Sequence, residues 1–162
     1  MADLTGMRTE ALLRNKDAQL RATLDSTLDG ILAVDPSGKV LYASRRFSKL
    51  FRIPQELMDR GDDRALLDFV MDQFCDPVEF LKKVEKLYQS EDVGMDTIPF
   101  KDGRLFERFS MPMIMDGDYI GRVWSFRDIT ERRLFEAEKE KLEMQNRQLH
   151  KNESLGRMAG AI

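Results

Sequence analysis

The chain has 162 residues, a formal net charge of −3 and 34% charged residues. This length suits one domain of ordinary size with helical extensions, and the small net charge does not favour a nucleic-acid or membrane-surface partner. No apolar run approaches the roughly 18 residues that a membrane span needs, and the N-terminus lacks a signal-peptide core. The single cysteine excludes an internal disulfide and fits a reducing cytoplasm.

Residues 8–28 are expected to form an amphipathic helix. Leu13, Leu20, Leu24 and Leu28 are spaced seven, four and four residues apart, which places them in a stripe along one helix face. The stripe fits either a cap laid over the domain or one half of a parallel helix pair at a dimer interface.

A β-hairpin and a set of short helices are expected next. The strands cover residues 31–34 and 39–43, and Asp35-Pro36-Ser37-Gly38 forms the turn between them. Ser44 is a candidate cap for a helix that contains Phe47, Leu50 and Phe51 and ends before Pro54. Further helical segments are expected just after Pro54 and over residues 62–74.

The clearest helix start in the chain is Asp76-Pro77-Val78-Glu79. Asp76 can cap the helix, Pro77 suits its first position, and Glu79 can reach back to the cap. The helix is expected to run to about Gln89. Its predicted inner face consists of Val78, Leu81, Val84 and Leu87.

Three strands follow, over residues 93–100, 104–114 and 119–127. Turn residues separate them at Lys101-Asp102-Gly103 and at Met115-Asp116-Gly117-Asp118. Strands at both ends of a domain with helices between them predict an α+β fold, with five antiparallel strands and the helices packed on one face.

The sequence becomes rich in Glu, Lys and Leu after Thr130, and it contains no Gly or Pro before Gly156. We therefore expect a long exit helix from about Glu131. Phe135, Leu142 and Leu149 follow the seven-residue coiled-coil period, and the phase breaks before the apolar residues resume at Leu155, Met158 and Ile162. A single amphipathic helix docked on its own domain is one reading. A parallel dimeric helix that permits rotation or a change of register is the reading we favour.

Two stretches resemble known signalling proteins. GRVWSFRDITERR (121–133) is similar to the last strand and exit of PAS sensor domains, where an Asp-Ile-Thr triplet marks the junction to a signalling helix. Residues 153–162 resemble the run just before the phosphoacceptor histidine of sensor histidine kinases, and the resemblance puts that histidine just after the last residue. From the expected elements and these two resemblances we predict three parts of the chain: an N-terminal helix (1–28), a PAS domain (29–130) and a signalling coiled-coil helix (131–162).

No catalytic or metal-binding constellation is found in the sequence. His150, the only histidine, lies among charged residues and is expected to be solvated, so no triad or metal cluster is predicted. Cys75 lacks the sequence context of flavin-binding PAS domains, and we expect a half-buried structural role for it. Residues 77–89 contain no histidine to bind haem. We therefore predict no catalytic residue, no metal and no cofactor.

A small-molecule pocket and a filled core both fit the aromatic and methionine residues that alternate along the last three strands. The candidate ligand contacts are Arg108, Phe109, Met111, Trp124 and Ser125. At the domain exit, Arg127 and Asp128 are expected to form a salt bridge. With Ile129 and Thr130 they make up the predicted signal junction.

The resemblance implies the sensory module of a cytoplasmic histidine kinase, which acts as a homodimer and has no activity of its own. Its partners would be the downstream kinase domain and a response regulator. Two alternatives stay open. One is a PAS dimerisation module that binds no ligand, and the other is a cofactor-binding redox or light sensor that feeds an effector other than a kinase.

Overall fold

The computed structural model describes residues 3–160, and side chains are described for residues 4–156. The chain divides into two compact units, residues 1–128 and 129–162. The elements of the first unit are α1 (Asp3–Asp25), β1 (Gly30–Val34), β2 (Val40–Ala43), α2 (Arg45–Leu50), α3 (Gln55–Asp59), α4 (Asp63–Met71), α5 (Pro77–Tyr88), β3 (Gly94–Pro99), β4 (Leu105–Met115) and β5 (Asp118–Asp128). The second unit contains α6 (Thr130–Gly160).

The sheet has five antiparallel strands in the order β2-β1-β5-β4-β3. The last strand in sequence, β5, is the central one, and it pairs with β1 on one side and with β4 on the other. Leu32 lies opposite Trp124, and Ser110 lies opposite Trp124 from the other side. The predicted α+β fold with five antiparallel strands is confirmed.

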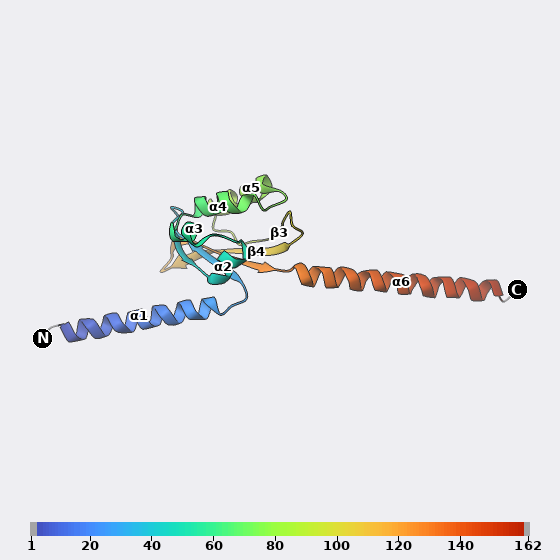
Figure 1. Cartoon of the computed structure of the whole chain (residues 1–162), viewed down its shortest axis with the longest axis horizontal. Helices are drawn as coiled ribbons and strands as arrows, with labels where there is room; N and C mark the ends of the chain where they lie inside the picture. Colours follow the sequence, from blue (N-terminus) through green and yellow to red (C-terminus); the bar gives the residue numbers. More distant parts are fainter. Residues whose placement is uncertain (1–2, 161–162) are drawn as a thin grey trace. The chain divides into compact units, whose positions relative to one another are not determined.

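Helices α2 to α5 connect β2 to β3, and α4 and α5 run along the same side of the sheet (Figure 1). Apolar side chains of these helices and of the inward-facing strand positions form one buried core, as expected for a sheet covered on one face. The core includes Leu32, Val34, Phe47, Phe51, Leu66, Val70, Phe74, Phe80, Val84, Ile98, Phe100, Phe106, Trp124 and Phe126.

Two helix caps follow the sequence pattern. The Ser44 hydroxyl accepts hydrogen bonds from the Phe47 amide at the start of α2 (3.2 Å) and from the Ile31 amide of β1 (2.9 Å). The Asp76 carboxylate accepts from the Glu79 amide at the start of α5 (3.0 Å). In each case a side-chain oxygen satisfies an amide that the helix leaves free.

The inner face of α5 differs from the sequence expectation. Phe80 and Val84 are its buried residues, whereas Val78 is 63% exposed. The expected face is right at Val84 and at Leu87, which packs against the core, and it is wrong at Val78 and omits Phe80. Phe80 belongs to the core because its ring packs against the Phe74 ring, at a centroid separation of 4.5 Å.

Element boundaries also shift. Helix α1 begins at Asp3 and ends at Asp25, and α4 ends at Met71, three residues before the expected end. The β4–β5 turn contains Asp116 and Gly117, both with positive φ (52° and 83°). This is the backbone conformation for which an Asp-Gly pair is favoured in a tight hairpin.

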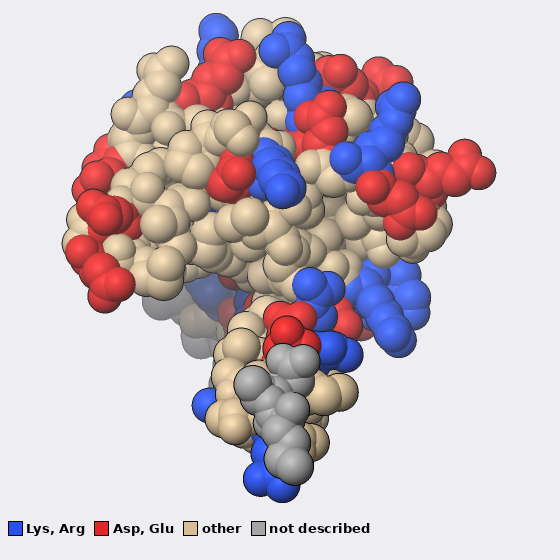
Figure 2. Space-filling model, turned by 90° about the vertical axis from the view of Figure 1, so that its left-hand side faces the viewer, with Lys and Arg blue, Asp and Glu red and all other residues tan. Residues whose placement is uncertain are grey.

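The second unit is one helix, and its side chains from 131 to 156 are all exposed. None of the helices in the described part of the chain is long and apolar enough to cross a membrane. On the face shown in Figure 2, acidic and basic side chains are interspersed instead of forming one large patch of a single sign. This face therefore gives no electrostatic reason to expect a polyanionic partner.

Candidate functional site

The interior beneath the helices is filled by aromatic rings. The Phe51 ring lies 4.8 Å from the Phe126 ring and 5.4 Å from the Phe106 ring, between centroids. The space left between α2, α4 and β5 is about 30 Å³ and is lined by residues that include Phe47 and Leu66. That volume can hold a water molecule, and a typical metabolite needs roughly ten times more.

The five candidate ligand contacts lie on two faces of the sheet. Arg108 and Trp124 point to the covered face and are 1% and 3% exposed. The neighbouring strand positions Phe109, Met111 and Ser125 point to the opposite face, because successive residues of a strand alternate. The five residues therefore do not surround one space.

Arg108 is held by charge and by aromatic rings. Its Nε and Nη2 donate to the two carboxylate oxygens of Asp96 at 2.8 and 2.6 Å, and Lys83 lies 3.3 Å from the same carboxylate. The guanidinium carbon is 4.6 Å from the centre of the Phe80 ring and 5.6 Å from that of Trp124. Arg108 thus joins β3, β4 and α5 through a bidentate ion pair and cation–π contacts.

Arg122, on β5, is a second buried guanidinium, and sequence reasoning missed it. Its Nε donates to the Leu87 carbonyl at the end of α5 (3.1 Å), and its Nη1 and Nη2 donate to the Asp92 carbonyl. Burial lowers the pKa of Arg122 below its ordinary value. A signal was present in the sequence, because Arg122 shares the alternation of the inward-facing Trp124 and Phe126.

At the domain exit, Arg127 forms an ion pair that the sequence did not predict, with Asp29. Arg127 donates to Asp29, which precedes β1, at 2.8 and 3.1 Å, and this bond raises the pKa of the Arg127 guanidinium. The Ser125 hydroxyl reaches the same carboxylate at 3.5 Å. Arg127 therefore links the end of β5 to the start of β1. Because Arg127 is 56% exposed, the pair contributes little to stability.

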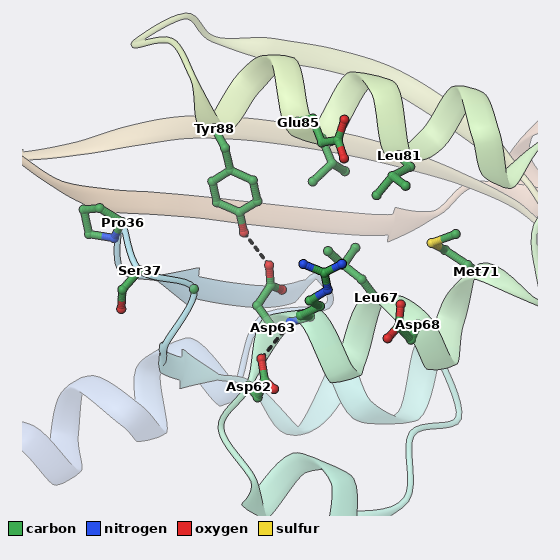
Figure 3. Close-up of a pocket in the computed structure, with 13 residues that line it drawn as sticks. Pro36, Ser37, Asp62, Asp63, Leu67, Asp68, Met71, Leu81, Glu85 and Tyr88 are labelled. Atoms are coloured by element: carbon green, nitrogen blue, oxygen red, sulfur yellow. Dashed lines mark hydrogen bonds between the residues drawn. The ribbon is translucent and has the colours of Figure 1, made fainter.

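A cleft of about 460 Å³ opens between α4, α5 and the β1–β2 turn, outside the filled interior. We call it the α4–α5 cleft. The Asp63 carboxylate, on α4, accepts a hydrogen bond from the Tyr88 hydroxyl, on α5, at 2.6 Å (Figure 3). The other residues that line the α4–α5 cleft are Pro36, Ser37, Gly38, Asp62, Arg64, Leu67, Asp68, Met71, Leu81, Val84 and Glu85.

The comparisons with known proteins agree with this geometry. A family model described as the PAS fold matches residues 24–134, which is more than half of the chain. The chain belongs to the PAS family. No curated protein matches the sequence significantly.

Solved structures show the same PAS fold at low identity. The PAS domain of BvgS from Bordetella pertussis is 16% identical with a TM-score of 0.56, and the alignment covers 81% of this chain and 98% of that one. The PAS domain of an HTR-like protein from Haloarcula marismortui is 16% identical with a TM-score of 0.54, covering 76% and 99%. The sensor region of a sensor histidine kinase is 20% identical with a TM-score of 0.51, covering 64% of this chain and only 40% of that one.

The apolar stripes expected on the two terminal helices can be followed in the described part of this PAS protein. On α6 the stripe consists of Phe135, Leu142, Leu149 and Leu155, all more than half exposed. Met158 and Ile162, also expected in it, lie outside the residues with described side chains. On α1, Leu13 and Leu20 are exposed and Leu24 is half-buried.

The two reactive side chains of the PAS protein are both on the surface. Cys75 is exposed, so the expectation of a half-buried cysteine is wrong. It follows the last turn of α4, where its amide donates to the Pro99 carbonyl and its side chain points outward. His150 is exposed on α6. Among the described residues, no group of His, Cys, Asp and Glu side chains could hold a metal ion.

Proposed function

We propose that this PAS protein is the sensory, signal-transducing module of a histidine kinase, in which the exit strand passes a signal or a dimer state to paired exit helices. The observation that carries the proposal is the place of β5. It is the central strand of the sheet, bonded on both sides, and its last residue, Asp128, is followed after one residue by the start of α6 at Thr130. A displacement of β5 therefore reaches α6 through continuous backbone.

The proposed α6 pair is supported by side chains that need a partner. Phe135, Leu142 and Leu149 repeat every seven residues and are exposed in a single chain. Apolar residues at this period are buried when two helices supercoil around each other. We infer a parallel homodimer through α6, and the exposed leucines of α1 are a second candidate surface for the same dimer.

The histidine kinase assignment draws support from two sources. Solved structures of the same fold include the sensor region of a sensor histidine kinase, and residues 153–162 resemble the run before a phosphoacceptor histidine. We propose a cytoplasmic kinase domain and a response regulator as the downstream partners. The signal junction then consists of Arg127, Asp128, Ile129 and Thr130.

The test is made in the full-length kinase with Asp128→Ala and Thr130→Ala. Both variants should change basal or signal-dependent autophosphorylation, because each alters the junction between β5 and α6. Asp72→Asn, an exposed carboxylate at the end of α4, is the matched control and should behave as wild type. If both junction variants keep wild-type autophosphorylation with and without the signal, the relay proposal fails.

A PAS dimerisation module that binds no ligand is the second candidate, and the filled interior favours it. A native mass spectrum of the purified chain separates the two. A dimer at the bare chain mass would support this candidate, and a dimer with added mass would identify a ligand. The third alternative, a cofactor-binding sensor, needs an interior much larger than about 30 Å³.

A further inference from the structure

The α4–α5 cleft combines an apolar floor with an acidic rim. Leu67, Met71, Leu81 and Val84 supply the floor, and Figure 3 shows the side chains of α4 and α5 facing each other across it. The acidic side chains are Asp62, Asp63, Asp68 and Glu85, and Arg64 is the one cationic side chain among the lining residues. Four carboxylates against one guanidinium make the cleft anionic, and a volume of about 460 Å³ is within the usual range for small-molecule sites.

Asp63 is an independent sign of a cationic ligand. Its side chain is 6% exposed, yet no Lys, Arg or His in the described part of the chain forms an ion pair with it. Its hydrogen bond comes from the neutral Tyr88 hydroxyl, and the like charge of Asp62 adds to the rise in the pKa of Asp63. A buried carboxylate that lacks a counter-ion is costly, so a cation brought beside it is stabilised.

We propose that the α4–α5 cleft binds a small organic ammonium ion, with the apolar body of the ligand on the Leu67–Leu81 floor and the ammonium group at Asp63. The acidic rim and the apolar floor together indicate this class of ligand. A metal ion would leave the apolar floor uncovered, and a neutral or anionic molecule would bring no positive charge to the carboxylates.

The cleft is mechanically connected to the exit strand. The Tyr88 ring lies 5.6 Å from the Trp124 ring of β5, between centroids, and the next carbonyl toward the N-terminus, that of Leu87, accepts the Arg122 bond from the same strand. A ligand that displaces the Tyr88 hydroxyl from Asp63 would shift Tyr88, and so would alter both its ring contact with Trp124 and the neighbouring Arg122–Leu87 hydrogen bond. The coupling to output rests on the function proposed above, whereas ligand binding does not.

The experiment uses the whole 162-residue chain with 2-phenylethylamine as the probe and the similarly shaped neutral 2-phenylethanol as its control. Trp124 is the only tryptophan, so its fluorescence reports events at Tyr88, and calorimetry gives the affinity. The amine should bind at least about tenfold more tightly than the alcohol. Equal affinities, or no detectable binding of the amine at millimolar concentration, would overturn the proposal.

Variants locate the site. Asp63→Asn should weaken amine binding at least about tenfold, and Glu85→Gln, an exposed change on the cleft rim that does not threaten folding, should weaken it by a smaller factor. Asp72→Asn lies outside the cleft and should leave binding unchanged. If Asp63→Asn does not fold, the amine affinities of Glu85→Gln and Asp68→Asn test the site instead. Wild-type affinity in both variants would contradict binding in this cleft.

Binding should also depend on pH. Burial raises the pKa of Asp63, and the titratable and charged groups that line the cleft with it are Tyr88 and Glu85 on α5 and Asp62, Arg64 and Asp68 in and just before α4. An ammonium ion binds the ionised carboxylate, so affinity should rise as the pH increases through that raised pKa, and Asp63→Asn should remove this rise.

The ligand site and the relay can fail separately. If the amine binds but kinase output does not respond, the site stands and its coupling to the relay fails. If the amine does not bind but the junction variants alter output, the relay stands without this ligand.

Discussion

Two arginines of the β5–β4 region are buried by different means. Arg108 faces a carboxylate, Asp96, whereas Arg122 is surrounded by the backbone carbonyls of Leu87 and Asp92 and by the Ser110 hydroxyl. Carbonyl oxygens carry only partial charge, so Arg122 keeps its positive charge inside the protein with weaker compensation. It binds the C-terminal end of α5, where the helix dipole favours a cation.

Removing the partner of Arg108 should be strongly destabilising. Asp96→Ala leaves the buried guanidinium without its bidentate partner, which typically costs about 3–5 kcal/mol of unfolding free energy. Urea denaturation followed by Trp124 fluorescence measures the loss. In the double variant with Arg108→Met the total loss should be smaller than the sum of the two single losses, since the unpaired charge is gone. Additive losses would show that the pair does not interact.

Gly121 is a backbone position that no other residue fits. Its φ is +143°, and an added Cβ would lie 2.2 Å from the Val34 carbonyl oxygen. Gly121→Ala should therefore destabilise the domain by at least about 2 kcal/mol, through backbone strain and a clash between β5 and β1. Gly117→Ala is the matched control, with positive φ but open space around the new Cβ. Equal losses in the two variants would mean that the contact with Val34 is unimportant.

At the scale of elements, α6 exposes apolar side chains at the seven-residue period of paired helices. Leu142→Gln replaces the middle residue of the seven-residue repeat Phe135, Leu142 and Leu149 and keeps a good helix former, so it should raise the dimer dissociation constant about tenfold or more. Sedimentation equilibrium measures that constant. Met144→Gln is the control, because Met144 is exposed but lies off the seven-residue repeat. Equal effects of the two substitutions would contradict the proposed helix pair.

The elements show which features a sequence can reveal. Local chemistry was predictable, since the Ser44 and Asp76 caps and the Asp116-Gly117 turn depend on neighbouring residues alone. The inner face of α5 was predictable only in part, at Val84 and Leu87, because Phe80 is buried against Phe74, a contact between residues of separate elements. Likewise the partner of Arg127 is Asp29, which lies at the far end of the domain sequence and is brought close by strand pairing.

The same limit applies more strongly to the α4–α5 cleft. Its walls come from three separate segments, the turn at 36–38, helix α4 and helix α5. Asp63 and Tyr88 are 25 residues apart and are both polar, so no pattern in the sequence predicts that they meet. The aromatic strand residues fitted either an interior pocket or a filled core, and in the structure the rings of Phe100, Phe106, Trp124 and Phe126 belong to the filled core.

At the scale of the whole molecule, Asp63 gives stability a predictable pH dependence. Its folded-state pKa is raised above the ordinary value of 3.8, mainly by burial, so the stability it provides is complete below that value and is lost as the pH rises through the raised pKa. Above about pH 4, as the pH rises through the raised pKa of Asp63, wild type should therefore lose stability relative to Asp63→Asn. Chemical denaturation at a series of pH values measures this. A pH-independent difference between the two proteins would contradict it.

Asp25 should act in the opposite direction. Its pKa is lowered from 3.8, first by the hydrogen bond from the Arg45 amide and also by that from the Tyr42 hydroxyl. The stability it provides is present above 3.8 and is lost as the pH falls through the lowered pKa. Asp25→Asn should thus be destabilising near neutral pH, and its deficit should shrink in strong acid. A deficit that is unchanged in acid would argue against this assignment.

The central place of β5 has a consequence for synthesis on the ribosome. The hairpin β1–β2 is made first and the hairpin β3–β4 much later, and β5 is the strand that joins them in the sheet. Residues such as Gly30 and Phe126 must meet across nearly the whole domain sequence, and such distant pairings form slowly. Until residue 128 leaves the exit tunnel, the nascent chain exposes two half-sheets with unpaired edges, which are prone to aggregation. The helix that follows β5 thus supplies, while still in the tunnel, the length of chain that lets the last strand reach its place.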